Sequence, residues 1–260
     1  MSMKIAHSHH HLKRRIEEFF TARDEHQTAR ALIEALAERH QVWIFGGMLR
    51  DITLFGGDNF TSDIDIVFDG ERDELFRLLS VNVVGPWTVN KLGGIRFRFS
   101  HMDFDMWCLS DTWAFKENLI PLIDARSLFR TTLMSWDAVL YDVHRREVIT
   151  PENYLDDLTR GYLEIVLRAT PNETGAIVRI LRTIFQKEVK TLGPMLSDFL
   201  HQMLENYEYA ALAAYEHSHF NSRSFSDSQY LFLRHYLRHA ERGKALPLPC
   251  HQAFIQLQNH

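Results

Sequence analysis

The first seventy residues change their hydrophobic period several times, and each change marks a predicted element. Within residues 12–40 apolar positions recur at intervals of three and four, which predicts a helix with one buried face; they are Ala29, Leu32, Ile33, Leu36 and Ala37. The short apolar run 42–45 ends at Gly46-Gly47, which predicts a buried strand followed by a turn. Residues 48–55 suit a helix again, and the glycine-rich segment 56–59 predicts a loop.

Strict alternation follows, and it predicts a half-buried strand. The apolar and acidic residues that alternate are Ile64, Ile66 and Phe68 against Asp63, Asp65 and Asp69. A short helix is predicted over 71–79. Strands are then predicted over 81–89, 95–99, 104–109, 139–143 and 147–149, with a hairpin-like break at 91–94.

Beyond about residue 150 the strand patterns stop. Helices are predicted over 155–167, 176–189, 194–214 and 228–242. The pattern therefore indicates an α+β protein with a mixed sheet and flanking helices in front and an all-helical part behind. We place the first domain at 20–150 and the second at 151–260.

Composition narrows the class of protein. The chain is 45% hydrophobic, enough for a substantial core, and it has no apolar run of about 18 residues that would cross a membrane. A polar, histidine-rich start predicts no secretory signal, and two isolated cysteines, Cys108 and Cys250, suit a reduced compartment. We therefore expect a cytoplasmic protein. The histidines at positions 7 and 9–11 are expected to form a disordered tail or a cloning remnant without a metal role.

The net charge of the chain indicates how well it would bind nucleic acid. A formal charge of −5 lacks the basic surplus that usually supplies affinity for nucleic acid, so it argues mildly against a long RNA footprint.

The turn at Gly46-Gly47 is the first candidate for chemistry. A strand, a glycine turn and a helix start place backbone N–H groups at a helix N-terminus, where they attract phosphate. Glycines allow a phosphate to approach the backbone closely. A glycine pair alone is weak evidence, because most such pairs are plain turns.

The acidic residues make the prediction specific. Asp63 and Asp65 share one face of their strand, and two carboxylates on one face repel each other unless a cation lies between them. A third carboxylate on a neighbouring strand would complete a site for two magnesium ions, with Mn²⁺ as an alternative. We favour Asp105 for this position, since apolar residues continue its strand, and we keep Asp103 as the alternative. Such a set can neutralise a triphosphate and activate an attacking hydroxyl.

These motifs together resemble a known family. Gly46-Gly47-Met48-Leu49-Arg50-Asp51, followed by Ser62-Asp63-Ile64-Asp65-Ile66, is similar to the head of the CCA-adding enzymes and bacterial poly(A) polymerases, within the DNA polymerase β-like nucleotidyltransferases. Fainter similarity continues through Ser135–Tyr141 and 155–161 into a neck at 179–182, so the resemblance covers about residues 40–190.

The resemblance implies a polymerase β-like nucleotidyltransferase head followed by a helical neck and cap. It also implies transfer of a nucleoside monophosphate from an NTP to a hydroxyl at an RNA 3′ end. It carries Gly46, Gly47, Arg50 and Asp51 over to nucleotide binding, and it suggests that Arg179 and Arg182 of the neck face the nucleotide.

The departures concern specificity. Thr131-Thr132-Leu133 stands where the family has Arg-Arg-Asp, Asp137 stands at an Asn position, and the neck lacks a clear Glu-Asp-x-x-Arg. CCA specificity therefore does not transfer. Two alternatives stay open: nucleotide transfer to a small molecule or a protein side chain, and a nucleotide-binding module without catalysis.

Overall fold

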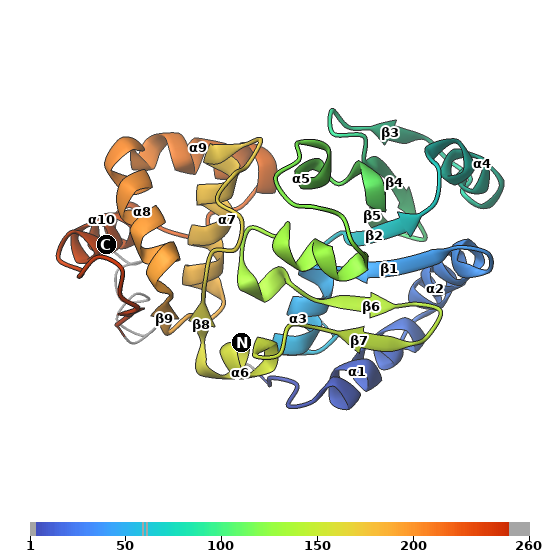
Figure 1. The fold of residues 1–260 in the computed structure, drawn as a ribbon, viewed down its shortest axis with the longest axis horizontal. Coiled ribbons are helices and arrows are strands. Elements are labelled where there is room, and N and C mark those ends of the chain that lie inside the picture. The colour runs from blue at the N-terminus through green and yellow to red at the C-terminus, as the bar shows by residue number, and fades with distance from the viewer. Residues whose placement is uncertain (1–3, 59, 61, 250–260) are drawn as a thin grey trace. The chain divides into compact units, whose positions relative to one another are not determined.

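A computed structural model describes residues 4–58, 60 and 62–249 of the chain (Figure 1). The chain divides into two compact units. The N-terminal unit comprises Met1–Thr132 and Trp136–Leu155, and the C-terminal unit comprises Leu133–Ser135 and Asp156–His260. Cys250 and the last residue of the predicted loop 56–59 lie outside the described residues.

A seven-stranded mixed sheet forms the centre of the N-terminal unit, in the order β3-β4-β5-β2-β1-β6-β7. Strands β2 and β5 pair in parallel, and every other neighbouring pair of this sheet is antiparallel. The strands are β1 (Gln41–Phe45), β2 (Ile64–Asp69), β3 (Trp87–Val89), β4 (Ile95–Phe99), β5 (Met102–Cys108), β6 (Leu140–Asp142) and β7 (Glu147–Ile149).

Helices pack against this sheet. Helix α1 contacts α2, α3 and β7, while α3 also contacts β1 and β2, and α4 contacts β5. Their bounds are α1 (His9–Thr21), α2 (Asp24–Ala37), α3 (Gly47–Phe55), α4 (Arg72–Asn82) and the short α5 (Trp113–Lys116), and α6 (Tyr154–Arg160) begins at the end of the unit. Three 3₁₀ turns lie at Leu109–Asp111, Ala125–Arg130 and Ser135–Asp137.

Strand β2 is buried more completely than its alternating sequence predicted. Ile64, Ile66 and Phe68 are buried on one face, and Val67 is buried on the other. β2 lies between β1 and β5 in the interior of the sheet, so neighbouring strands pair with both of its edges, and α3 packs against it. The carboxylates of this strand are consequently held on a rigid central element.

The C-terminal unit is mainly helical. Its helices are α7 (Glu173–Gln186), α8 (Pro194–Asn206), α9 (Tyr209–Phe220) and α10 (Asp227–Arg238). Helix α7 contacts α9, and α8 contacts α10. The Asn172 side chain accepts a hydrogen bond of 2.9 Å from the N–H of Gly175 and so caps the start of α7. Among the described residues, no helix is long and apolar enough to cross a bilayer.

Three two-residue strands add a small sheet that the sequence pattern did not predict. They are β8 (Tyr162–Leu163), β9 (Thr191–Leu192) and β10 (Leu246–Pro247), in the order β10-β9-β8. The helix predicted over 155–167 therefore ends at Arg160. Gly161 has φ +67°, a conformation that favours glycine and stops a helix, and β8 follows directly.

Other predicted boundaries were also wrong. The helix predicted over 194–214 is two helices, because the chain becomes extended at Tyr207 and Glu208. The strand predicted over 81–89 is formed only at its end, since α4 continues through Asn82.

The N-terminal histidines are not a detached tail. His9–His11 form the first turn of α1, which the Ser8 side chain caps by accepting from the N–H of His11. The His9 ring also lies 2.8 Å from the hydroxyl of Thr150, just after β7. The buried face of α1 begins at Leu12, and Ala6 just before the helix is buried as well.

Candidate active site

Three carboxylates meet at the centre of the large sheet. Asp65 lies in β2 and Asp63 just before it, while Asp105 lies in β5. Because β2 and β5 are parallel, their register places Asp65 directly beside Asp105. One carboxylate oxygen from each of the three lies within 4.8 Å of the others. Asp103 is not in this group: its side chain is 66% exposed and lies 3.9 Å from Arg98.

The donor set suits a hard divalent cation. Carboxylate oxygens are the ligands that Mg²⁺ and Mn²⁺ prefer, and three of them at this separation repel one another without a positive charge. Burial raises the pKa of Asp105, the hydrogen bond from Arg96 partly offsets this, and the charge of Asp63 raises it further. Asp63, Asp65 and Asp105 therefore fit the metal site that the sequence predicted.

Arg96 supplies the positive charge next to these carboxylates. It is the register partner of Asp105 across β4 and β5, and its Nε donates a 2.8 Å hydrogen bond to Oδ2 of Asp105. The hydrogen bond to Asp105 raises the pKa of Arg96 although partial burial lowers it, and the charges of Asp63 and Asp65 act in the same direction as Asp105.

The carboxylates are closely packed on one side and lie next to a hollow on the other. Gly94 lies so close that a Cβ there would be 2.9 Å from Oδ1 of Asp105 and 2.6 Å from the Asn90 side chain. On the open side, a hollow of about 330 Å³ is lined by Asp63, Arg96, Phe97, Asp103 and Phe104. Of the three clustered carboxylates, Asp63 is the one that lines this hollow.

The glycine turn lies beside the same carboxylates. Gly46 has φ +73° and ends β1, and its N–H donates to the carbonyl of Val139 at 3.0 Å. A Cβ on Gly46 would be 4.0 Å from Oδ2 of Asp65. Gly47 opens α3, whose first-turn N–H groups have no partner within the helix. The turn and the carboxylates thus form one continuous site within the N-terminal unit.

Arg50 and Asp51, predicted to bind nucleotide, form an internal network. The Arg50 guanidinium donates to Asp51 at 2.8 Å and makes a short ion pair with Asp137. Burial alone lowers the pKa of Arg50, but Asp137 and Asp51 outweigh it and raise the pKa above its usual value. The hydroxyl of buried Tyr154 donates to the Trp136 carbonyl nearby, at 3.0 Å. These contacts fasten α3 to the segment around residue 137, and a nucleotide role for Arg50 and Asp51 stays a prediction.

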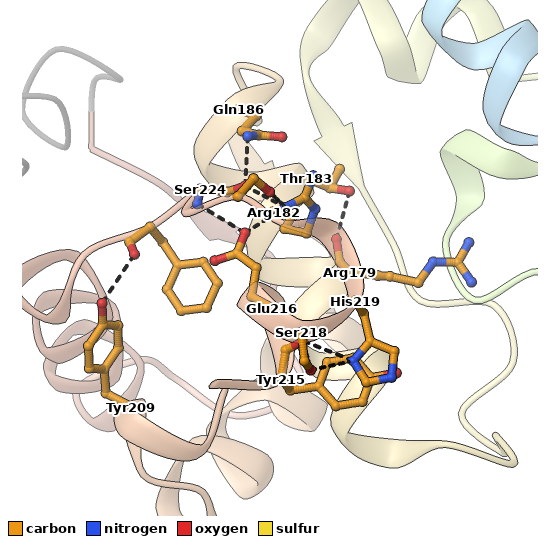
Figure 2. Close-up of polar contacts among 12 residues, drawn as sticks. Arg179, Arg182, Thr183, Gln186, Tyr209, Tyr215, Glu216, Ser218, His219 and Ser224 are labelled. Atoms are coloured by element: carbon orange, nitrogen blue, oxygen red, sulfur yellow. Dashed lines mark hydrogen bonds and ion pairs between the residues drawn. The ribbon is translucent and has the colours of Figure 1, made fainter. Parts of the chain in front are cut away.

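Arg179 and Arg182, the neck arginines, lie on α7 of the C-terminal unit. Figure 2 shows Arg182 pointing into a cluster with Glu216 and Ser224, while the Arg179 side chain points away from that cluster. Nη1 of Arg182 lies 2.6 Å from Glu216 and donates to Ser222 and Ser224 at 2.7 and 2.8 Å. Glu216 is fully buried. Arg182 therefore has a structural role inside its unit, and its predicted contact with nucleotide stays a prediction.

Sequence reasoning missed two parts of the site. It did not single out Gly94, although a glycine one residue before a strand opposite an acidic strand is a signal of close approach. It also treated Asp137 only as a departure from the family, although Asp137 is the ion-pair partner of Arg50. No local pattern links residues so far apart in the chain.

Comparisons with known proteins agree with this architecture at the level of the fold. No protein-family profile matches the chain, and no curated protein matches it significantly in sequence. Solved structures do match. The Thermotoga maritima CCA-adding enzyme complexed with tRNA has a TM-score of 0.60 at 15% identity, over 86% of this chain and 54% of that one. A CCA-adding enzyme in complex with CTP has a TM-score of 0.60 at 13% identity, over 92% and 56%.

A further solved structure is a tRNA nucleotidyltransferase complexed with a primer tRNA and an incoming ATP analog. Its TM-score is 0.57 at 16% identity, over 79% of this chain and 59% of that one. The chain spans little more than half the length of these structures. The predicted resemblance to nucleotidyltransferase heads and the predicted α+β fold class are confirmed as a likeness of fold.

Proposed function

We propose that the protein transfers a nucleoside monophosphate from an NTP to an acceptor hydroxyl and releases pyrophosphate. The observation that carries this proposal is the convergence of Asp63, Asp65 and Asp105 beside the Gly46-Gly47 turn. Backbone N–H groups that bind phosphate and carboxylates that can bind metal ions are the two parts that phosphoryl transfer uses. The likeness of fold to nucleotidyltransferases supports the same reaction class.

Each residue then has a distinct task. Asp63 and Asp65 would hold both ions, which neutralise the triphosphate, and Asp105 would hold the ion on the acceptor side. Two Mg²⁺ ions would supply charge neutralisation at the phosphorus and at both the attacking and the leaving oxygen. The first turn of α3 receives the phosphates through its backbone N–H groups. Asp105 would lie nearest the attacking hydroxyl and would accept its proton.

For the acceptor we propose an RNA 3′ hydroxyl. Two of the similar structures are described as complexes with tRNA, and others as complexes with CTP or ATP, which supports an NTP and RNA pair here. The net charge of −5 favours the alternative, a small molecule or a protein side chain, because a long RNA footprint needs basic surface.

The test is a labelling experiment. Each α-³²P-labelled NTP is incubated with Mg²⁺ and with total RNA, total protein or a metabolite extract, and the labelled product is identified. We expect label on RNA, lost in Asp65→Asn and kept in the matched control Asp103→Asn. Label confined to protein or metabolites would select the alternative acceptor. Thermal stabilisation by NTP and Mg²⁺, with no pyrophosphate released in any mixture, would mark a binding module and refute catalysis.

A further inference from the structure

We propose that Arg96 is a built-in substitute cation, which neutralises Asp105 until a metal ion takes the acceptor side of the site. This inference rests on the proposed function, and it makes Arg96 a positioning residue that controls the order in which the site is filled.

The geometry singles out Arg96. Its backbone is the register partner of Asp105, so its guanidinium reaches the carboxylate across a single strand pair. The bond runs from Nε to Oδ2 at 2.8 Å, while Oδ1 of Asp105 faces Gly94. Arg98, on the same face of β4, lies beside Asp103, which is outside the carboxylate group. Of these two arginines on one face of β4, Arg96 is the one that reaches the carboxylate group.

Electrostatics explains why a cation is needed there. Asp105 has only 13% of its side chain exposed, and it lies within 4.8 Å of two other carboxylates. Such a group is costly to keep ionised unless a positive charge is close. The Arg96 guanidinium provides that charge, and it lies in the field of Asp63 and Asp65 as well.

The exposure of Arg96 allows the Arg96–Asp105 ion pair to open. The Arg96 side chain is 61% exposed, and the structure gives it one hydrogen bond to Asp105, through Nε. By contrast, Arg50 is only 12% exposed and is held by two carboxylates. An exposed guanidinium can move into solvent at little cost once another cation neutralises the buried Asp105, whereas breaking the buried pairs of Arg50 costs several times more. Arg96 can therefore leave Asp105 while Arg50 stays in place.

A consequence for the order of binding follows. The ion that accompanies the triphosphate would bind Asp63 and Asp65 first, while Asp105 is still paired with Arg96. When Asp105 takes up a cation, the guanidinium is released toward the hollow that Asp63, Arg96 and Phe97 line. There it can bind a phosphate of the acceptor or of the NTP.

Mn²⁺ binding to the whole protein tests the inference without any substrate. The free Mn²⁺ concentration is followed by electron paramagnetic resonance for wild type, Arg96→Gln, Arg98→Gln and Asp105→Asn. The Arg98 variant is the matched control, because it removes the same charge from the same face of β4. We expect Arg96→Gln to lower the dissociation constant of the site that Asp105→Asn loses by about two- to fivefold, and Arg98→Gln to leave it unchanged.

A second measurement observes the guanidinium itself. The Nε–H resonance of Arg96, assigned by its loss in Arg96→Lys, should shift when diamagnetic Mg²⁺ is added to wild type. It should not respond to Mg²⁺ in Asp105→Asn.

Each contrary result has one meaning. Equal tightening in both arginine variants would be a net-charge effect and would overturn the inference. Unchanged affinity in Arg96→Gln, with one site lost in Asp105→Asn, would overturn the inference but leave the proposed function standing. Full Mn²⁺ binding in Asp105→Asn would remove the metal site and the proposed function together.

Discussion

Asp65 and Asp105 lie side by side as register partners on parallel strands, although α4, β3 and β4 separate them along the chain. Parallel pairing puts both side chains on one face of the sheet, so their charges add at one point. This relationship makes the site sensitive to single changes of charge.

The first prediction concerns that point. Asp65→Asn should lower nucleotide transfer on the order of 10²–10³-fold, because a negative charge that binds the cation is lost. The free energy of unfolding should not fall, since the change relieves repulsion from Asp63 and Asp105. Initial rates and urea unfolding check both parts. A loss of activity of the same size in Asp103→Asn would contradict the assignment of the site.

A matched pair of substitutions tests the glycine turn. Gly46→Ala should destabilise the fold by about 1–3 kcal/mol, because φ +73° with ψ −122° strains any residue with a Cβ. Gly47→Ala should change stability by less than about 0.5 kcal/mol, since its Cβ would meet only the end of Arg50 at 3.7 Å.

Urea unfolding of both alanine variants measures this difference in unfolding free energy. Nucleotide affinity then separates a second effect. The methyl group of Gly47→Ala would lie where we expect the phosphate to approach. The KM of this variant for NTP should therefore rise without a loss of stability. Equal stability of the two variants would show that the turn relaxes.

The buried ion pair between Arg50 and Asp137 should be costly to break. Arg50→Ala leaves the nearly buried Asp137 without this guanidinium, and we expect a loss of about 3–5 kcal/mol in unfolding free energy. Arg14→Ala is the control, because it breaks an exposed pair with Glu18 of 3.5 Å, and it should cost less than about 1 kcal/mol. Denaturant unfolding monitored by circular dichroism compares them, and similar midpoints for the two variants would refute the argument.

In the C-terminal unit, the two neck arginines should behave differently. Arg182→Ala should cost about 3–5 kcal/mol, because Glu216 is fully buried and loses its counter-charge. Arg179 is exposed, and Arg179→Ala should change stability by about 0.5 kcal/mol or less. The stabilisation of each folded variant by saturating NTP shows whether either arginine also contacts nucleotide. Equal stability of the two variants would contradict the structural role of Arg182.

Acid should weaken the ion pair between Glu205 and Arg238 of the C-terminal unit over a defined range of pH. Two hydrogen bonds from Arg238, at 2.6 and 2.8 Å, lower the pKa of Glu205 to about 2 from an ordinary 4.5. A lowered carboxyl pKa stabilises the fold above the unfolded pKa, and this stability is lost as pH falls through the folded pKa. Glu205→Gln should therefore melt below wild type at pH 7, and the difference should shrink between pH 4.5 and 2.

Because this pair is exposed, added salt should shrink the same difference at pH 7. Differential scanning calorimetry across pH and salt measures both effects. A melting difference that does not depend on pH would show that packing, rather than charge, makes Glu205 important.

The sequence by itself determined the features that depend on neighbours along the chain. The apolar run before Gly46 makes β1, the alternation around Asp65 makes β2, and the spacing of apolar residues makes α2 and α7. These patterns, with the glycine and acidic motifs, also determined the resemblance to nucleotidyltransferase heads, since local periodicity and turn chemistry act within a few residues.

Only the tertiary structure decided how distant segments meet. Sequence left Asp103 and Asp105 as alternatives, and the parallel register of β2 with β5 brought Asp105 to the group, because strand pairing is a non-local choice. Pairing of β4 with β5 set Arg96 against Asp105, and folding of residue 137 onto α3 set its carboxylate against Arg50. Charges interact through space rather than along the chain, so the ion pairs of this site could be identified only from the paired strands.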